Sequence, residues 1–209
     1  MTKKFIITLG RECGAGATLI AEELSKKLNI PYYDKDIFRM VSDKSGVLEE
    51  FFHVNNERPG NNLLYKIIKD LKPSDQKPSL GKDIVSPDNL FRFQSEMIRE
   101  LAENETCIII GRCADYVLKD YDHVVNVFVC GDAESKILRM MRTFSLERDA
   151  AVERIRETDK QRRKYYSYYT GRDWEAAANY DLCLNTGNMT IPEAAEQILF
   201  YLRQRKYID

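Results

Sequence analysis

The fold is decided by the stretch Phe5-Ile6-Ile7-Thr8-Leu9, followed by Gly10-Arg11-Glu12-Cys13-Gly14-Ala15-Gly16-Ala17-Thr18 and then Leu19-Ile20-Ala21-Glu22-Glu23-Leu24. The first part is apolar and β-branched, the second carries glycines, and the third has helix-forming residues. A strand, a tight turn and a helix therefore follow one another without a gap. This order gathers backbone N–H groups and the positive end of a helix at one spot. We therefore predict a phosphate site at Gly14, Ala15, Gly16, Ala17 and Thr18.

The turn is similar to a nucleotide-binding P-loop but lacks its lysine. The P-loop pattern ends in Gly-Lys-Ser/Thr, whereas this chain has Gly16-Ala17-Thr18. Thr18 keeps a hydroxyl that can hold Mg²⁺, or it is simply part of the first helical turn. Arg11 lies inside the turn and can supply part of the missing charge, because its guanidinium never deprotonates. The alternative for Arg11 is a salt bridge to Glu12 or another surface acid.

The rest of the chain alternates between strand and helix patterns. The apolar runs are continuous, which favours strands covered on both faces of a parallel sheet. Helical periods lie between them, so the chain follows an α/β doubly wound plan. The prediction is a three-layer fold with a five-stranded parallel sheet and helices on both faces, its strands at residues 5–9, 30–33, 107–110, 124–129 and 182–184.

Composition limits the function classes. The 209 residues are 44% hydrophobic and 31% charged, which suits one domain with a sizeable core, and the net charge of −1 argues against a general nucleic-acid binder. No apolar run has the length of a membrane span or a secretory signal. Five scattered cysteines without a Cys-x-x-Cys pair indicate reduced core residues rather than structural zinc. We therefore expect a cytoplasmic protein that contacts neither nucleic acid nor membrane.

Two segments depart from this alternation. Residues 53–86 form a long polar insertion, which we interpret as a flap on the acceptor side of a single domain spanning 1–209. Residues 147–180 form a lid-like helical segment rich in basic side chains, among them Arg156, Arg162 and Arg163, and in tyrosines. Its first part also suits a solvated helix. Its four clustered tyrosines exceed one buried helix face, so we expect contacts with another lobe, a ligand or a second subunit of a homodimer.

Taken together, these pieces resemble the cytidylate kinase-like family of P-loop nucleoside monophosphate kinases over nearly the whole chain. None of the matching motifs is decisive alone, but their order and spacing are typical of the family. They are Thr8 to Gly16, Pro31-Tyr32-Tyr33-Asp34-Lys35-Asp36, Ile108-Ile109-Ile110-Gly111-Arg112, Tyr165 to Trp174, and Asn179-Tyr180-Asp181-Leu182-Cys183-Leu184-Asn185-Thr186.

The resemblance implies a reaction and a set of roles. It implies phosphoryl transfer from ATP, with Mg²⁺, to a nucleoside monophosphate such as CMP or another small acceptor. Asp34, Arg39 and Arg112 match the acceptor-binding positions, and Asp159, Arg162 and Arg163 fall where the lid charges belong. We accordingly assign catalytic roles to Arg11, Arg156, Arg162 and Arg163. Two departures are Ala17 in place of the lysine and Cys113 in place of an aspartate after Gly-Arg.

Other interpretations stay open. A dinucleotide-binding fold has some support, because Asp34 follows Gly14 by twenty residues, but Leu19 replaces its third glycine. A non-catalytic nucleotide or anion sensor and a ligand-free dimerisation module are the other rivals. Arg112 can instead pair structurally with Asp34 or Asp115, and Asp34 can cap the helix that follows it.

Overall fold

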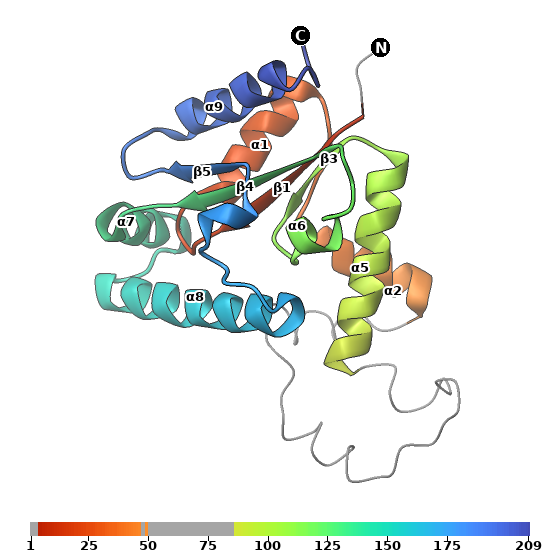
Figure 1. Ribbon diagram of the computed structural model, residues 1–209. Helices are drawn as coiled ribbons and strands as arrows, with labels where there is room; N and C mark the ends of the chain where they lie inside the picture. The colour runs from red at the N-terminus through yellow and green to blue at the C-terminus, as the bar shows by residue number, and fades with distance from the viewer. Residues whose placement is uncertain (1–3, 47–48, 50–85) are drawn as a thin grey trace, which may run out of the picture.

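The computed structural model describes residues 4–46, 49 and 86–209 (Figure 1). The flap predicted at 53–86 lies outside the described residues, apart from Ser86 at its end. The strands are β1 (Ile6–Arg11), β2 (Tyr32–Tyr33), β3 (Cys107–Ile110), β4 (Val124–Cys130) and β5 (Leu182–Asn185). The described α-helices are α1 (Ala17–Leu28), α2 (Asp36–Ser45), α5 (Pro87–Asn104), α6 (Ala114–Val117), α7 (Ala133–Phe144), α8 (Arg148–Thr170) and α9 (Ile191–Gln204), with a 3₁₀ turn at Ala177–Asn179.

The five strands form one parallel sheet in the order β2-β3-β1-β4-β5. In the centre of the sheet, Ile7 of β1 pairs with Ile108 on one side and Val125 on the other. The predicted five-stranded parallel sheet is confirmed. Because all strands run the same way, their carboxyl ends meet at one edge, and the loops after β1 and β3 lie next to each other there.

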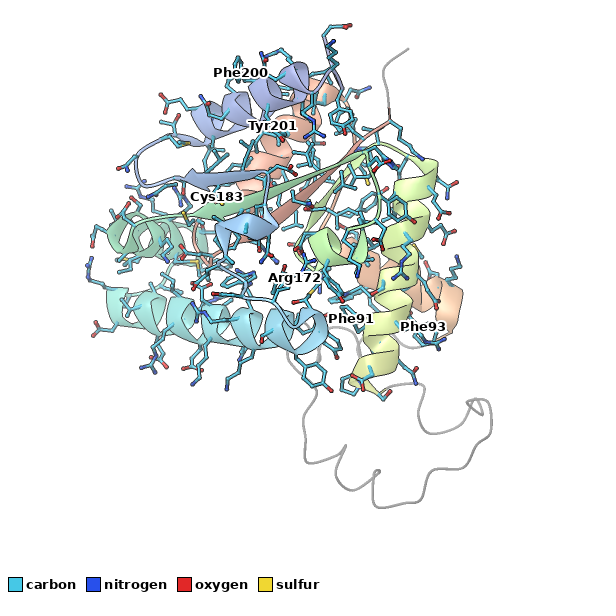
Figure 2. All side chains as sticks on the ribbon, viewed as in Figure 1. Phe91, Phe93, Arg172, Cys183, Phe200 and Tyr201 are labelled. Carbon is cyan, nitrogen blue, oxygen red and sulfur yellow. The ribbon has the colours of Figure 1, made fainter. Side chains whose placement is uncertain are left out.

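Helices cover both faces of the sheet (Figure 1), and side chains fill the space between these layers (Figure 2). The alternation of buried side chains along β1 shows how the two layers are built. Ile7 and Leu9 point to the layer of α1 and α9 and belong to its buried cluster. Ile6 points the opposite way, to the cluster formed with α2, α5 and α6. This period of two is what a strand between two apolar layers requires, and it explains why the sequence is apolar without interruption.

The helices α7 and α8 pack against each other beside the carboxyl edge of the sheet (Figure 1). Cys13 of the loop after β1 packs in one small cluster with Met140 of α7 and Ala151 of α8. Further along α8, Tyr165 and Tyr166 are buried with Phe128 of the sheet. Tyr165 and Tyr166 therefore fill space between α8 and the rest of the domain, whereas Tyr168 of the same cluster is 51% exposed. Among the described helices, none combines the length and apolarity needed to cross a membrane.

Candidate functional site

The glycine loop between β1 and α1 has the backbone form of an anion site. Gly14 and Gly16 have φ angles of 80° and 89°, and Gly16 caps α1 without any side-chain hydrogen bond. Within the described part of the chain, the N–H groups of Gly14, Gly16, Ala17 and Thr18 meet no hydrogen-bond acceptor. N–H groups at the start of a helix that have no intrahelical partner are the groups that bind phosphate.

Neighbouring elements hold the loop by its carbonyl oxygens. Thr186, just after β5, donates its hydroxyl to the carbonyl oxygen of Ala15 at 2.7 Å, and Arg139 of α7 donates to that of Gly14. A Cβ atom at Gly14 would lie 2.8 Å from the carbonyl oxygen of Lys136, and one at Gly16 would lie 2.8 Å from Ile191 Cδ1. Gly14 is therefore required by close packing against backbone as well as by its positive φ angle, whereas Gly16 is required by its φ angle, because the end of the Ile191 side chain can move aside.

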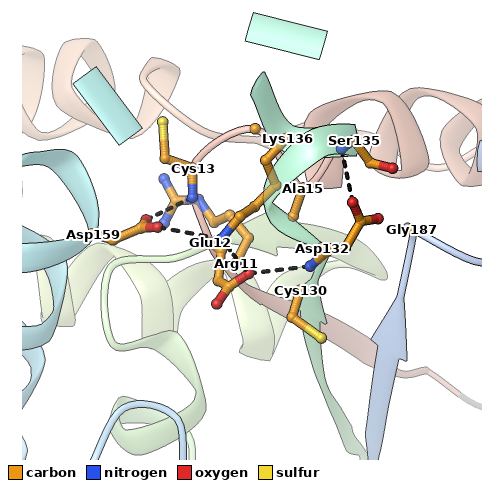
Figure 3. A network of polar contacts seen from close by, with 12 residues as sticks. Arg11, Glu12, Cys13, Ala15, Cys130, Asp132, Ser135, Lys136, Asp159 and Gly187 are labelled. Carbon is orange, nitrogen blue, oxygen red and sulfur yellow. Dashed lines mark hydrogen bonds and ion pairs between the residues drawn. The ribbon is translucent and has the colours of Figure 1, made fainter. Parts of the chain in front are cut away.

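Charged side chains from α7 and α8 reach the first half of the loop (Figure 3). The carboxylate of Asp159, on α8, accepts a hydrogen bond from the N–H of Cys13 at 2.6 Å. The ammonium of Lys136, on α7, lies 2.9 Å from a carboxylate oxygen of Glu12. That oxygen also accepts the N–H of Gly131 at 3.1 Å, so the loop, β4 and two helices are joined by polar contacts.

A small cavity lies at the same edge of the sheet, behind the ends of β1 and β3. Three arginines line it, Arg11, Arg112 and Arg162, together with Asp115. Its other walls include Tyr165, Tyr166, Trp174 and Tyr180. The cavity measures about 20 Å³, which is room for about one water molecule. The site is thus rich in positive charge and closed by aromatic side chains.

Packing and charge hold Arg112 in this cavity, and they do so although its backbone is strained. Gly111, Arg112 and Cys113 have successive φ angles of 71°, 62° and 54°, a left-handed turn that costs non-glycine residues about 1–2 kcal/mol each. The side chain of Arg112 is 1% exposed, and its guanidinium lies 3.9 Å from the ring centre of Phe38. It also lies 3.6 Å from the carboxylate of Asp34. Strained, buried arginines of this kind are typical of functional sites.

Asp34 links two of the three arginines. The same carboxylate oxygen lies 3.6 Å from Nη2 of Arg112 and 3.9 Å from Nη2 of Arg11. The side chain of Arg11 is 11% exposed, so it faces the interior rather than solvent. Of the alternatives left open by the sequence, the structure thus places Asp34 beside Arg112 and Arg11. Arg162 completes the group, donating to the carbonyl oxygen of Arg11 at 3.2 Å.

Asp115 is the acidic member of the cavity. Its carboxylate accepts the hydroxyl of Tyr166 at 2.6 Å, which ties α6 to α8. Burial raises the pKa of Asp115 above its usual value, while the Tyr166 hydroxyl and the more distant Arg172 oppose that rise. Asp115 therefore contributes a buried carboxyl, bonded to Tyr166, to the same cavity that the three arginines line.

Comparison with known proteins shows the family of this chain. The sequence model of the cytidylate kinase-like family matches residues 6–188. The protein belongs to the cytidylate kinase-like family. Among curated relatives, a cytidylate kinase of Sulfurisphaera tokodaii is 23% identical over 198 residues, covering 94% of both chains. A cytidylate kinase of Methanopyrus kandleri is 26% identical over 198 residues, covering 90% of this chain and 88% of the relative.

Solved structures show the same architecture for this family member. An uncharacterized protein from Eubacterium ventriosum superimposes with a TM-score of 0.70 and 26% identity, covering 97% of this chain and 100% of the other. A shikimate kinase from Bacteroides thetaiotaomicron gives a TM-score of 0.54 at 15% identity, covering 95% and 98%. The second likeness shows the fold alone, which is the three-layer P-loop kinase fold expected from the sequence.

The structure of this family member gathers some of the predicted site residues and separates others. Arg11, Arg112 and Arg162 share the cavity, with Asp34 beside them. Arg39 is exposed on α2, and Arg156 is 67% exposed and paired with Glu153. Arg163 pairs with Glu175 and does not line the cavity. The roles assigned to these last three arginines stay predictions.

Thr18 fits the expected magnesium site of the family. It is exposed in the first turn of α1, next to N–H groups that meet no acceptor in the described part of the chain. No group of three or more metal-binding side chains occurs within the described ranges. Mg²⁺ in nucleotide sites needs none, because it binds phosphate oxygens and water and takes one or two protein oxygens. One hydroxyl at this place therefore suits the ion.

Three residues that contact the loop were given no role in the sequence analysis, although Thr186 ends one of the matching motifs. Lys136, Arg139 and Thr186 all contact the loop, yet they lie more than a hundred residues away in sequence. Neither Lys136 nor Arg139 stands in a motif. The only signal available was position, because α7 follows a strand that had to end at the same edge of the sheet as the loop.

Proposed function

We propose that this family member binds a nucleoside triphosphate with Mg²⁺ and transfers its terminal phosphoryl group to a small acceptor such as a nucleoside monophosphate. One observation carries the proposal. Three arginines share a cavity that adjoins a loop with N–H groups left open for an anion. Phosphoryl transfer needs positioning and charge neutralisation more than covalent help, and these groups supply both.

On the donor side, the loop N–H groups from Gly14 to Thr18 would hold the phosphates of the triphosphate. The hydroxyl of Thr18 would bind Mg²⁺, which supplies charge neutralisation at the phosphates when bound. Family membership supports this assignment, and the loop geometry supports it independently. Ala17 cannot contribute a charge, so another cation must do so.

On the acceptor side, Arg112 and Arg11 would bind the acceptor's phosphate by exchanging Asp34 for it. The carboxylate of Asp34 lies 3.6 Å and 3.9 Å from the two guanidinium groups. These ion pairs are long, so a phosphate that forms shorter hydrogen bonds with the same guanidinium groups would displace the carboxylate. Cys113 stands where cytidylate kinases carry an aspartate. CMP is therefore one acceptor to be tested beside the other nucleoside monophosphates.

The helix α8 would open and close over both sides. The cavity of about 20 Å³ is far smaller than the roughly 300–1,000 Å³ of ordinary ligand sites. An acceptor can therefore enter only if the residues of α8 that close the cavity, Arg162, Tyr165 and Tyr166, move outward. Closure would then bring Arg162 back against the transferred group and exclude water.

A screen of phosphate donors against acceptors tests the proposal. Each pair is incubated with Mg²⁺, and formation of the diphosphate of the donor is followed by chromatography. We expect turnover with ATP and at least one monophosphate, and its loss in Arg112→Met. Arg92→Met is the matched control, because Arg92 is exposed on α5 and pairs with Glu96. Absence of turnover with every pair would contradict the proposal.

A nucleotide or anion sensor is the second candidate function. Two observations favour it: the carboxylate of Asp159 already accepts a hydrogen bond from the N–H of Cys13 in the loop, and Ala17 stands in place of the P-loop lysine. A sensor would bind the triphosphate and change the position of α8 without turnover. Binding with no product in the same screen would select this function. A cytoplasmic location and a homodimer stay predictions from the sequence.

A further inference from the structure

A cluster of charged groups surrounds the carboxylate of Asp159, where α8 crosses the glycine loop (Figure 3). Its Oδ1 atom accepts the N–H of Cys13 at 2.6 Å and lies 3.9 Å from Nη1 of Arg162. Its Oδ2 atom lies 4.0 Å from Nζ of Lys136. One loop N–H group and two cations therefore converge on a single anionic group.

This is the environment that a phosphoryl group bound to the same loop would need. Phosphoryl oxygens accept hydrogen bonds from backbone N–H groups and pair with lysine and arginine, as the Asp159 carboxylate does here. Burial raises the pKa of Asp159 in spite of the Cys13 N–H and the two cations, so keeping this carboxylate charged and buried opposes folding. If an external anion replaced the Asp159 carboxylate at this place, the carboxylate would return to water.

Lys136 is positioned to act on that anion. Its carbonyl oxygen and Cβ atom lie 2.8 Å and 3.1 Å from where a side chain at Gly14 would begin, so it leaves α7 directly beside the loop. Its side chain is 12% exposed and runs back along the loop to Glu12, 2.9 Å from its ammonium. Ala17, where a P-loop carries its lysine, is small and 3% exposed.

The charges of these side chains require Asp159 to leave when a phosphoryl group arrives. Glu12 and Asp159 contribute two negative charges, and Lys136 and Arg162 two positive ones. A phosphoryl group added beside the Asp159 carboxylate would be repelled at short range in a partly buried site. A phosphoryl group that replaces it would keep both cations paired.

We propose that Lys136, from α7, is the cation that contacts the phosphoryl group bound at the glycine loop, in place of the lysine absent at Ala17. The carboxylate of Asp159 occupies the place of that phosphoryl group until the phosphoryl group displaces it. This inference rests on the proposed function and adds a residue to it. It also couples the donor site to α8, because Asp159 moves with that helix.

Calorimetric titration of the full chain with inorganic tripolyphosphate tests the inference. Lys136→Met keeps the stem beside Gly14 and removes the charge, and we expect it to weaken binding about tenfold to a hundredfold. Asp159→Asn removes the competing charge, and we expect about tenfold tighter binding. Lys160→Met is the control with unchanged affinity, because Lys160 is 55% exposed on α8 and pairs with Glu157. Urea midpoints establish that each variant is folded.

Either of two results would overturn the inference: wild-type affinity in folded Lys136→Met, or no gain in Asp159→Asn. Should Lys136→Met fail to fold, Asp159→Asn decides alone. The proposed function fails separately. Tripolyphosphate binding that depends on Lys136, with no product in the donor–acceptor screen, would leave the inference standing and refute catalysis. A wild-type protein that binds no tripolyphosphate would refute the inference, and the donor–acceptor screen would still decide the proposed function.

Discussion

The glycine loop and the arginine cavity lie side by side at one edge of the sheet, yet they use opposite means to attract an anion. The loop presents backbone N–H groups and has no charged side chain at Ala17. The cavity presents three arginines, one of them almost fully buried, held by a left-handed turn and by Asp34. One region relies on dipoles and the other on full charges.

The difference shows where the chain depends on distant partners. Arg11 and Arg112 of the cavity, and Asp34 beside them, come from the ends of three adjacent strands, so the sheet itself brings these charges together. The loop depends on α7, α8 and the residue after β5 for its shape and for any charge near it. Changes in the cavity should therefore affect ligand binding most, and changes around the loop should affect binding and stability together.

The largest effect is expected from Arg112→Met. The variant keeps a side chain against Phe38 and loses the charge, so the acceptor phosphate would lose a buried donor. Loss of such a donor costs about 10²–10³ in rate. The rate of product formation and the thermal shift produced by monophosphates measure it. Monophosphate stabilisation equal to that of wild type would remove the cavity from the acceptor site.

Gly14→Ala should cost about 3 kcal/mol of unfolding free energy, because it combines a positive φ angle with a clash. The added Cβ would lie 2.8 Å from the carbonyl oxygen of Lys136. Gly171→Ala is the matched control: φ is 69° there, but among the residues that the structure describes no atom beyond its chain neighbours lies within 4 Å of the added Cβ. That variant should lose about 1 kcal/mol. Urea unfolding of the pair compares them, and equal losses would mean that the loop does not need its close packing.

Tyr166→Phe should destabilise the protein in a pH-dependent way. Because the folded pKa of Asp115 is raised above its usual 3.8, its favourable contribution to folding is complete below that value and is lost as pH rises through the folded pKa. The Tyr166 hydroxyl offsets part of this loss by bonding the ionised carboxylate. We therefore expect a cost of about 2 kcal/mol at neutral pH and a smaller one near pH 4.

Urea unfolding of Tyr166→Phe at several pH values measures this effect. Tyr121→Phe is the control, because its hydroxyl bonds an exposed carboxylate, that of Glu103. A cost for Tyr166→Phe that does not change with pH would show that α8 is not held to α6 by an ionised carboxyl.

The smallest effect is expected from Thr186→Val, which removes the hydroxyl bonded to the carbonyl oxygen of Ala15. The shape of the side chain is kept, so the loss should be about 1 kcal/mol of stability. Triphosphate binding should weaken at the same time, since the loop loses one of its supports. Calorimetric titration checks the second effect, and unchanged affinity would show that the loop keeps its form unaided.

Much of the fold could be predicted from the sequence, because buried parallel strands are continuous apolar runs. The run 107–110 coincides with β3. The predicted strand at 5–9 overlaps β1, which begins one residue later and continues through Gly10 and Arg11. Two residues beyond the predicted strand pair with β4 through their backbones, which no side-chain pattern reveals. The rings of Phe128 and Tyr180 lie close to Gly10, which explains why this position is a glycine.

The site could be predicted where it follows strand ends and not where it depends on packing between helices. Arg112 follows an apolar strand, so its place at the carboxyl edge was evident before the structure. The contact of Asp159 with Cys13, and the position of Lys136 beside Gly14, depend on how α7 and α8 dock. The family resemblance placed Asp159 among the lid charges, but charged residues spaced along a solvated helix look the same whether or not one turn reaches the loop. Sequence spacing alone therefore could not show the contact of Asp159 with Cys13 or identify Lys136.

The central claim is that the N–H groups at the start of α1 bind the phosphates of a nucleotide. The most direct test follows the backbone amide resonances of Gly14, Gly16, Ala17 and Thr18 by nuclear magnetic resonance during titration with ATP and Mg²⁺. The account predicts that these four resonances shift together, with one apparent dissociation constant, and that they shift more than those of the exposed residues Arg203 and Gln204 at the end of α9. Saturating ATP that leaves all four unmoved would contradict it.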